Sequence, residues 1–109
     1  MMFVCTDTEP ETDEAAIPSI EQWVANTYDK GVALMGERLA PTSTATTVRV
    51  RGGELLLTDG PFAETKEVIC GFDILECADL DEAIAIARSH PMAYHGRIEL
   101  RAFDPLNLD

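Results

Sequence analysis

Basic residues are scarce in this chain of 109 residues. Eight lysines and arginines stand against twenty aspartates and glutamates, which gives a formal net charge of -12 at pH 7. A protein with this charge repels the phosphate backbone of nucleic acids and the anionic surface of membranes, so we expect neither as a partner. We interpret the acidic side chains as a solvated surface that keeps the protein soluble. They crowd into two groups: Asp7, Glu9, Glu11, Asp13 and Glu14; and Asp73, Glu76, Asp79, Asp81 and Glu82.

Long apolar runs are also missing. The apolar residues 1–5 are too few, and too soon followed by acids, for a secretory signal, and no later run approaches the length that spans a membrane. We therefore expect a cytoplasmic protein. Cys5, Cys70 and Cys77 are odd in number, lie within apolar stretches and lack the paired spacing of a zinc site, so we predict buried thiols.

Motifs of common cofactor and nucleophile sites are absent. The chain has no glycine-rich phosphate loop, serine nucleophile elbow or dinucleotide fingerprint. Its two histidines, His90 and His95, are separated by Pro91 and have no further metal ligands nearby. We expect no cofactor and no metal. We expect His90 to end a helix as a cation that suits the helix dipole, whereas His95 precedes a strand and could reach a cleft.

What the sequence does contain is a regular succession of strand and helix patterns. Ser19 and Asp79 have the form of helix N-caps, Gly31 and Pro91 mark where the two helices end, and Gly52-Gly53 indicates a tight hairpin. The predicted elements are a strand at 1–5, a helix from 20 to about 30, a strand at 32–35 beside the first, hairpin strands at 46–51 and 54–58, a strand at 68–77, a helix from 80 that ends before 91, and a strand at 97–102.

This order predicts one α+β domain over residues 1–109, with a ferredoxin-like split βαβ arrangement and an inserted β-hairpin. Right-handed crossovers would place both helices on one face of an antiparallel sheet. The strands at 1–5 and 68–77 are apolar on both sides, so the other face needs a cover as well. We predict a homodimer in which two sheets face each other.

One stretch stands out at the exit of the hairpin. Asp59-Gly60-Pro61-Phe62 places a carboxylate in a turn, and Lys66 and Glu67 follow closely. These are also the residue types that any such turn selects, with Phe62 as a core anchor. A carboxylate partly removed from water beside an ammonium is suited to act as a general base, whereas Lys66 would otherwise pair with an acid at the surface.

Four short motifs are DGPFAETKE at 59–67, GF at 71–72, DEA at 81–83 and GRIELR at 96–101. With these motifs the chain closely resembles the YCII-related proteins, and within them the branch with a DGPF domain. The resemblance implies a ferredoxin-like dimeric α/β barrel, small-molecule enzyme chemistry in the wider family with a histidine of the first helix paired with an aspartate, and genes near those of alternative sigma factors. This chain has no histidine in that helix, so only Asp59 carries over as a candidate.

We therefore predict a small organic ligand between the sheets of a homodimer, with cofactor-independent proton transfer of the isomerase or lyase kind. Asp59 would be the base, Lys66 or Arg101 would stabilise negative charge, and His95 would carry a proton. Phe62, Glu99 and Arg101 would contact an anionic or carbonyl-bearing ligand, although the charges of the last strand also suit salt bridges that set register. The rival hypothesis is a non-catalytic dimeric sensor or protein-interaction module linked to sigma-factor control.

Overall fold

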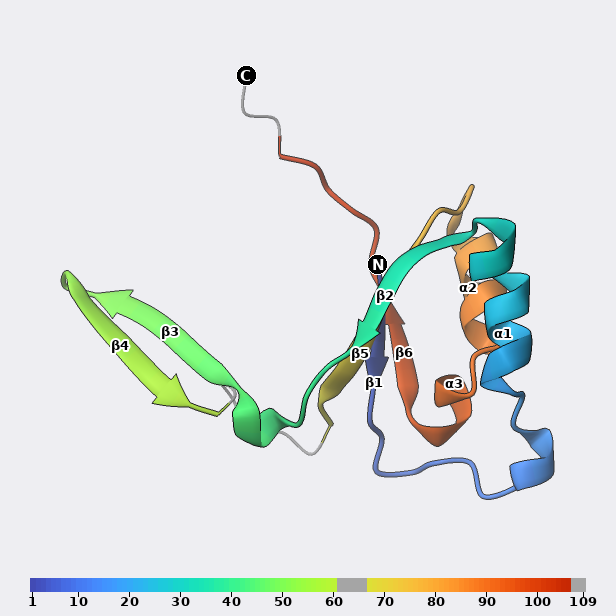
Figure 1. The fold of residues 1–109 in the computed structure, drawn as a ribbon, viewed down its shortest axis with the longest axis horizontal. Helices are drawn as coiled ribbons and strands as arrows, with labels where there is room; N and C mark the ends of the chain where they lie inside the picture. The colour runs from blue at the N-terminus through green and yellow to red at the C-terminus, as the bar shows by residue number, and fades with distance from the viewer. Residues whose placement is uncertain (61–66, 107–109) are drawn as a thin grey trace.

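The computed structural model describes residues 1–60 and 67–106 (Figure 1). Its α-helices are α1 (Ile20–Asn26), α2 (Leu80–Arg88) and α3 (Met92–His95), and short 3-10 helices cover Glu14–Ala16, Tyr28–Lys30 and Thr42–Thr44. Its strands are β1 (Met2–Cys5), β2 (Ala33–Arg38), β3 (Thr46–Arg51), β4 (Glu54–Asp59), β5 (Ile69–Leu75) and β6 (Arg97–Leu100).

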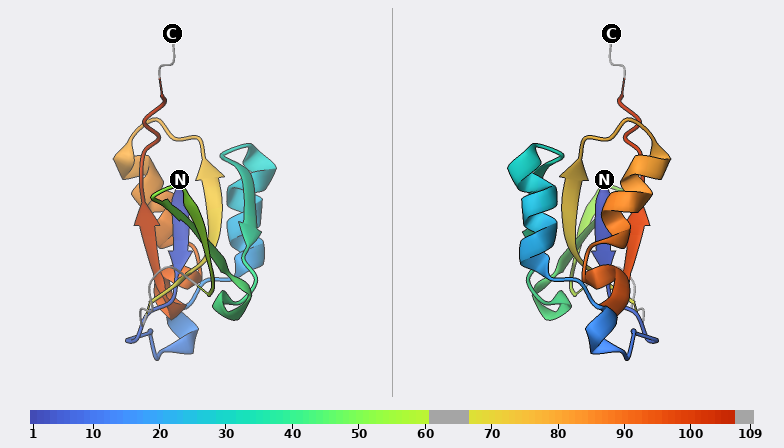
Figure 2. Two further views of the ribbon diagram at one scale, coloured as in Figure 1. Left: turned by 90° about the vertical axis from the view of Figure 1, so that its left-hand side faces the viewer. Right: turned by 90° about the vertical axis from the view of Figure 1, so that its right-hand side faces the viewer.

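The main sheet has four strands in the order β2-β5-β1-β6, and all neighbouring strands are antiparallel. β1 and β2 point the same way with β5 between them, which is a split βαβ arrangement. β3 and β4 form a separate two-stranded sheet, and in the described part of the chain neither sheet closes on itself. The helices lie on one face of the main sheet (Figures 1 and 2).

The sequence predicted the α+β class, the antiparallel sheet and the hairpin correctly. Two details were wrong: β2 pairs with β5 and not with β1, and a short additional helix, α3, precedes β6. The strand at the sheet edge was placed wrongly because a run of four apolar residues carries no information about its neighbour.

The predicted chain signals act as expected at the helix ends and at the hairpin. Ser19 Oγ accepts a hydrogen bond from the Gln22 amide at 3.1 Å, and Asp79 Oδ1 accepts one from the Glu82 amide at 2.8 Å. Gly52 and Gly53 have φ values of 57° and 80°, which only glycine adopts readily, and they form the tight turn between β3 and β4.

The core lies between the helices and the sheet. Its buried apolar side chains are Met2 and Val4 of β1, Trp23 of α1, Ala33 of β2 and Ala87 of α2. The Trp23 indole N–H also donates a hydrogen bond of 2.9 Å to the Ile86 carbonyl, so this side chain joins α1 to α2. The three cysteines are half-buried and form no disulfide, which corrects the expectation of buried thiols.

The other face of the main sheet, called the open face here, is only half covered. Phe3 lies opposite Phe72, and Met35 lies opposite Ile74. These four residues are next in sequence to Met2, Asp73 and Gly36 of the helix side, so they lie on the side that the helices do not cover. In residues 1–60 and 67–106, no helix has the length and apolar character needed to cross a bilayer.

Candidate functional site

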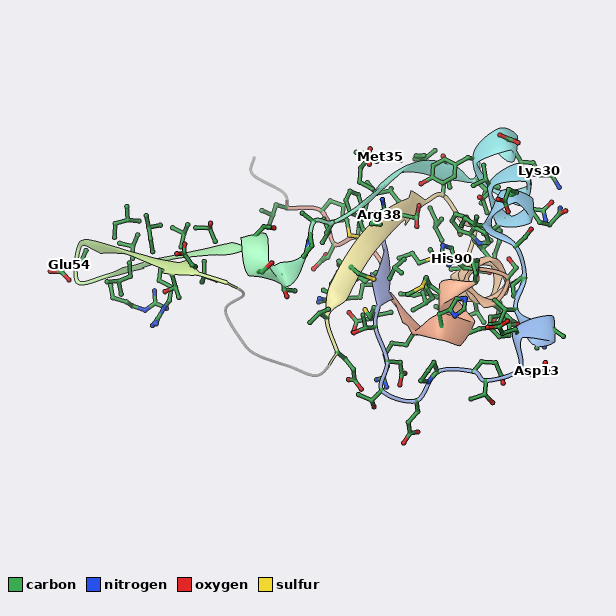
Figure 3. The ribbon with its side chains drawn as sticks, turned by 60° about the horizontal axis from the view of Figure 1, so that its bottom comes forward. Asp13, Lys30, Met35, Arg38, Glu54 and His90 are labelled. Atoms are coloured by element: carbon green, nitrogen blue, oxygen red, sulfur yellow. The ribbon has the colours of Figure 1, made fainter. Side chains whose placement is uncertain are left out.

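A cavity of about 520 Å³ lies on the helix side of the main sheet. It is walled by α1, by β2 and β5, and by the segment between α2 and α3. Most of its lining is apolar, and the polar groups come from Tyr28, Asp73, His90 and the exposed Glu37 and Arg38. Figure 3 shows His90 on the side of the sheet that the helices cover. An apolar cavity with a few converging polar groups is the usual form of a small-molecule site.

Asp73 is the most unusual of these groups, because it is a carboxyl side chain that is only 9% exposed. It lies on β5 opposite Met2 of β1 and Gly36 of β2, so it points to the helix side together with the core. Tyr28, just beyond α1, donates a hydrogen bond from its hydroxyl to Asp73 Oδ1. The burial corrects the interpretation of Asp73 as part of a solvated acidic group.

Gly36 makes the approach of these two side chains feasible. A Cβ atom at this position would lie less than 3.0 Å from Asp73 Oδ1 and from Tyr28 Oη. Because Gly36 of β2 has no side chain, Tyr28 has the space to reach Asp73.

Burial shifts the pKa of the acid and the pKa of the imidazole in the cavity in opposite directions. It raises the pKa of Asp73 above its ordinary value of 3.8, and the hydrogen bond from Tyr28 offsets this only in part. Burial and, second, the bond to Asp73 raise the pKa of Tyr28, so its hydroxyl stays protonated. Burial lowers the pKa of His90, which favours the neutral imidazole.

His90 is held in one orientation by its neighbours. Its ring meets Trp23 edge to face, with ring centroids 4.6 Å apart, and its Nδ1 accepts a hydrogen bond of 2.9 Å from the Met92 amide. A neutral imidazole that accepts at Nδ1 carries its proton on Nε2. The expectation that His90 ends a helix as a cation is wrong, because α2 ends at Arg88 and His90 is only 6% exposed.

Two residues of the cavity lining each have a polar side-chain atom without a partner among the described residues. In the described part of the chain, every buried side-chain nitrogen or oxygen has a hydrogen-bond partner. Asp73 Oδ2 and His90 Nε2 have no protein partner there, so both atoms must keep contact with open space. Since both residues line the same cavity, it offers a proton acceptor and a hydrogen-bond donor together.

The residues that the sequence predicted for the site lie elsewhere. Asp59 is the exposed last residue of β4, and His95 is the exposed last residue of α3. Glu99 lies on the open face opposite Phe3, and Arg101 follows β6 and lines a second cavity of about 370 Å³. Phe62 and Lys66 lie outside the described residues. The grouping of these six residues into one site stays a prediction.

The charged face of the last strand contains salt bridges within the chain. Arg97 Nε lies 2.8 Å from Asp7 Oδ2, and Arg97 Nη2 lies 3.2 Å from Glu67 Oε1. These contacts join β6 to the segments that follow β1 and precede β5. In the described residues, no three histidine, cysteine, aspartate or glutamate side chains gather closely enough to hold a metal ion.

Sequence reasoning missed Tyr28, Asp73 and His90 as parts of one cavity. A signal for Asp73 was present, because it is a charged residue in the middle of a strand whose other residues are apolar or glycine, Ile69–Leu75. An acid at such a position is rarely buried without a partner. The partner could not be identified, since Tyr28 lies 45 residues away and belonged to the apolar stripe of a predicted helix.

Two comparisons with known proteins match this chain. A family model described as YCII-related domain matches residues 1–107. An uncharacterized protein of Rhizobium meliloti (strain 1021) is 55% identical over 51 residues, which are 47% of this chain and 41% of that protein. The match therefore spans about two fifths of the length of that relative.

Proposed function

This chain belongs to the YCII-related domain family, and we propose that it binds a small organic molecule in the cavity beside Asp73 and transfers a proton within it. The proposal is supported by the fact that Asp73 and His90 line one largely apolar cavity, each with a polar side-chain atom that no described residue binds. A raised carboxyl pKa and a neutral imidazole are the properties that proton transfer near neutral pH requires.

The reaction that suits these groups is isomerisation of a carbonyl compound. The Asp73 carboxylate takes a proton from the carbon next to the carbonyl, and the electron pair of the broken C–H bond moves into the carbonyl to give an enolate. His90 Nε2–H donates a hydrogen bond to the enolate oxygen. When the substrate carries a hydroxyl on that carbon, a proton passes through His90 Nε2 from this hydroxyl to the enolate oxygen. The protonated Asp73 then returns its proton to the former carbonyl carbon, so the carbonyl moves by one carbon and the step is balanced without a cofactor.

The lining of the cavity and the net charge of the chain indicate which class of ligand would bind. An apolar lining of this volume fits a small organic molecule. The described cation of the lining, Arg38, is matched by Glu37, so neither the lining nor the net charge of -12 attracts an anion. We therefore favour an uncharged carbonyl compound with an acidic C–H bond. This differs from the anionic alternative of the sequence analysis, which was tied to the arginines of the last strand.

The homodimer remains part of the proposal. Phe3, Phe72, Ile74 and Met35 leave an apolar open face, and a second copy of the same face is a self-complementary cover. Such a dimer would be the ferredoxin-like α/β barrel, and the sequence Asp59-Gly60-Pro61-Phe62 supports the DGPF branch. A second site between the sheets with Asp59, Lys66 and His95 would depend on this dimer, whereas the Asp73 cavity belongs to one chain.

A comparison of two aspartates tests the function. Uncharged carbonyl metabolites are screened by thermal shift against the wild type, Asp73→Asn and the matched control Asp59→Asn. We expect compounds that stabilise the wild type and Asp59→Asn, and that lose most of this effect in Asp73→Asn.

Proton transfer is then measured for each compound that stabilises the wild type. In D2O, NMR should show protein-dependent exchange of the C–H proton next to the carbonyl, reduced at least about 100-fold in Asp73→Asn. Binding that depends on Asp73 without any exchange would remove the catalytic part of the proposal. Binding that depends on Asp59 alone would place the site at the hairpin instead.

A further inference from the structure

The β3–β4 hairpin, residues 46–59 and called the arm here, has two unlike faces. Residues paired across the two strands share a face, and Val48 pairs with Leu57 while Val50 pairs with Leu55. These four apolar side chains are 57–63% exposed. The opposite face carries Arg49 beside Leu56 and Arg51 beside Glu54. Figure 3 shows the nitrogen-bearing side chains on one side of the arm, with Glu54 at its tip.

This apolar face has no cover in the described part of the chain. The two strands form a sheet of their own, apart from the four-stranded sheet, and the arm extends away from it (Figure 1). A lone two-stranded hairpin is marginally stable in water, because it cannot bury enough apolar surface. A long apolar strand pair left in solvent is also prone to associate with other chains. The sequence therefore maintains a surface that needs another molecule.

We infer that a second copy of this chain covers the apolar face of the arm. The arm leaves the body on the side opposite the helices, which is the side of the open face (Figures 1 and 2). When two copies join by their open faces around a two-fold axis, each arm must pass beside the body of the partner. The arm then contacts the partner's share of the same apolar surface, including the region of Phe3 and Phe72.

The neutral charge of the arm allows a second copy to be the occupant despite the acidic body. Residues 46–59 contain two arginines and two acids, Arg49, Arg51, Glu54 and Asp59, so the arm is neutral and the other residues carry the whole net charge of -12. Two such bodies repel each other. The arm is a neutral segment whose apolar face can approach an acidic body, while its arginines remain available to acids at the rim of the contact.

This inference rests on the dimer in the proposed function but not on the Asp73 cavity. The dimer dissociation constant is measured by analytical ultracentrifugation for the wild type and for Val48→Thr/Val50→Thr, which keeps β-branched side chains of nearly the same shape. The matched control is Leu56→Thr on the other face, which keeps both arginines. We expect the first pair to weaken the dimer at least about tenfold and the control to change it by less than about threefold.

A cross-linking experiment identifies the occupant. A photoreactive p-benzoylphenylalanine replaces Leu57 in unlabelled protein, which is mixed with 15N-labelled wild type before irradiation. We expect peptides that join the unlabelled arm to the labelled body near Phe3 or Phe72. Cross-links confined to one chain, or their absence, would overturn the inference.

The outcomes separate the two proposals. A wild type that remains monomeric at high micromolar concentration overturns both the dimer and the arm contact, and leaves the cavity to its own test. A dimer that forms equally well in Val48→Thr/Val50→Thr, without cross-links from position 57, overturns the arm contact alone.

Discussion

Asp73 places a carboxyl group on the helix side of β5, between Met2 of β1 and Gly36 of β2. Its partner Tyr28 donates one hydrogen bond, and its second oxygen is left to the cavity. Residues that cost stability and are kept at a cavity are typical of binding and catalytic positions. Two predictions test how much stability the burial of Asp73 costs and how much its hydrogen bond from Tyr28 restores.

The burial of Asp73 makes the stability of the fold depend on pH. Because the pKa of Asp73 is raised in the folded state, its contribution to the free energy of unfolding is complete below pH 3.8 and is lost as the pH rises through the raised value. Asp73→Asn does not titrate. Urea unfolding from about pH 3.5 to 7 should therefore show the variant gaining stability relative to the wild type as the pH rises. A difference between the two proteins that is independent of pH would contradict the assigned burial.

The hydroxyl of Tyr28 stabilises the fold through its hydrogen bond to Asp73. Tyr28→Phe removes the hydrogen bond to Asp73, so we expect a loss of about 1.5 to 3 kcal/mol in the free energy of unfolding at pH 7. It should also raise the pKa of Asp73 further, which carboxyl 13C NMR measures, because that bond lowers it. Tyr94→Phe is the matched control, since the Tyr94 hydroxyl has no partner in the described residues, and equal losses in the two variants would sink the assignment.

At the scale of elements, local signals were enough for most helices and strands. Ser19, Asp79, Gly31 and the Gly52-Gly53 pair act on their immediate neighbours, so the sequence alone reveals them. Strand order is different, because β2 finds its place beside β5 through contacts between distant segments. α3 was missed because only four residues form it, too few for a periodic pattern.

The close approach of β2 to the Tyr28–Asp73 pair gives a prediction at this scale. Gly36→Ala places a methyl group where the two side chains meet, so we expect a loss of about 1 to 3 kcal/mol in the free energy of unfolding. Gly36→Ala/Tyr28→Phe removes the Tyr28 oxygen, one of the three oxygens that the new methyl group would crowd, so the combined loss should fall short of the sum by at least about 0.5 kcal/mol. Strict additivity in chemical denaturation would show that Gly36 does not serve this pair.

At the scale of the whole molecule, the two surfaces of interest lie on opposite sides of the main sheet. The cavity with Asp73 belongs to the helix side, whereas the open face and the arm belong to the other. Ligand binding at Asp73 should therefore survive variants that weaken the dimer. The sequence indicated the apolar open face, because period-two patterns can be read directly, but not the cavity, whose groups come from four separate segments.

We propose that the ligand site is the cavity beside Asp73. Its most direct test is an NMR titration of 15N-labelled protein with a compound from the carbonyl screen, in which each shifted amide marks a contact. We expect the largest shifts at Gly36, Gly71 and the indole N–H of Trp23, the only tryptophan, and their loss in Asp73→Asn. Shifts confined to Thr46–Asp59, or unchanged in that variant, would contradict it.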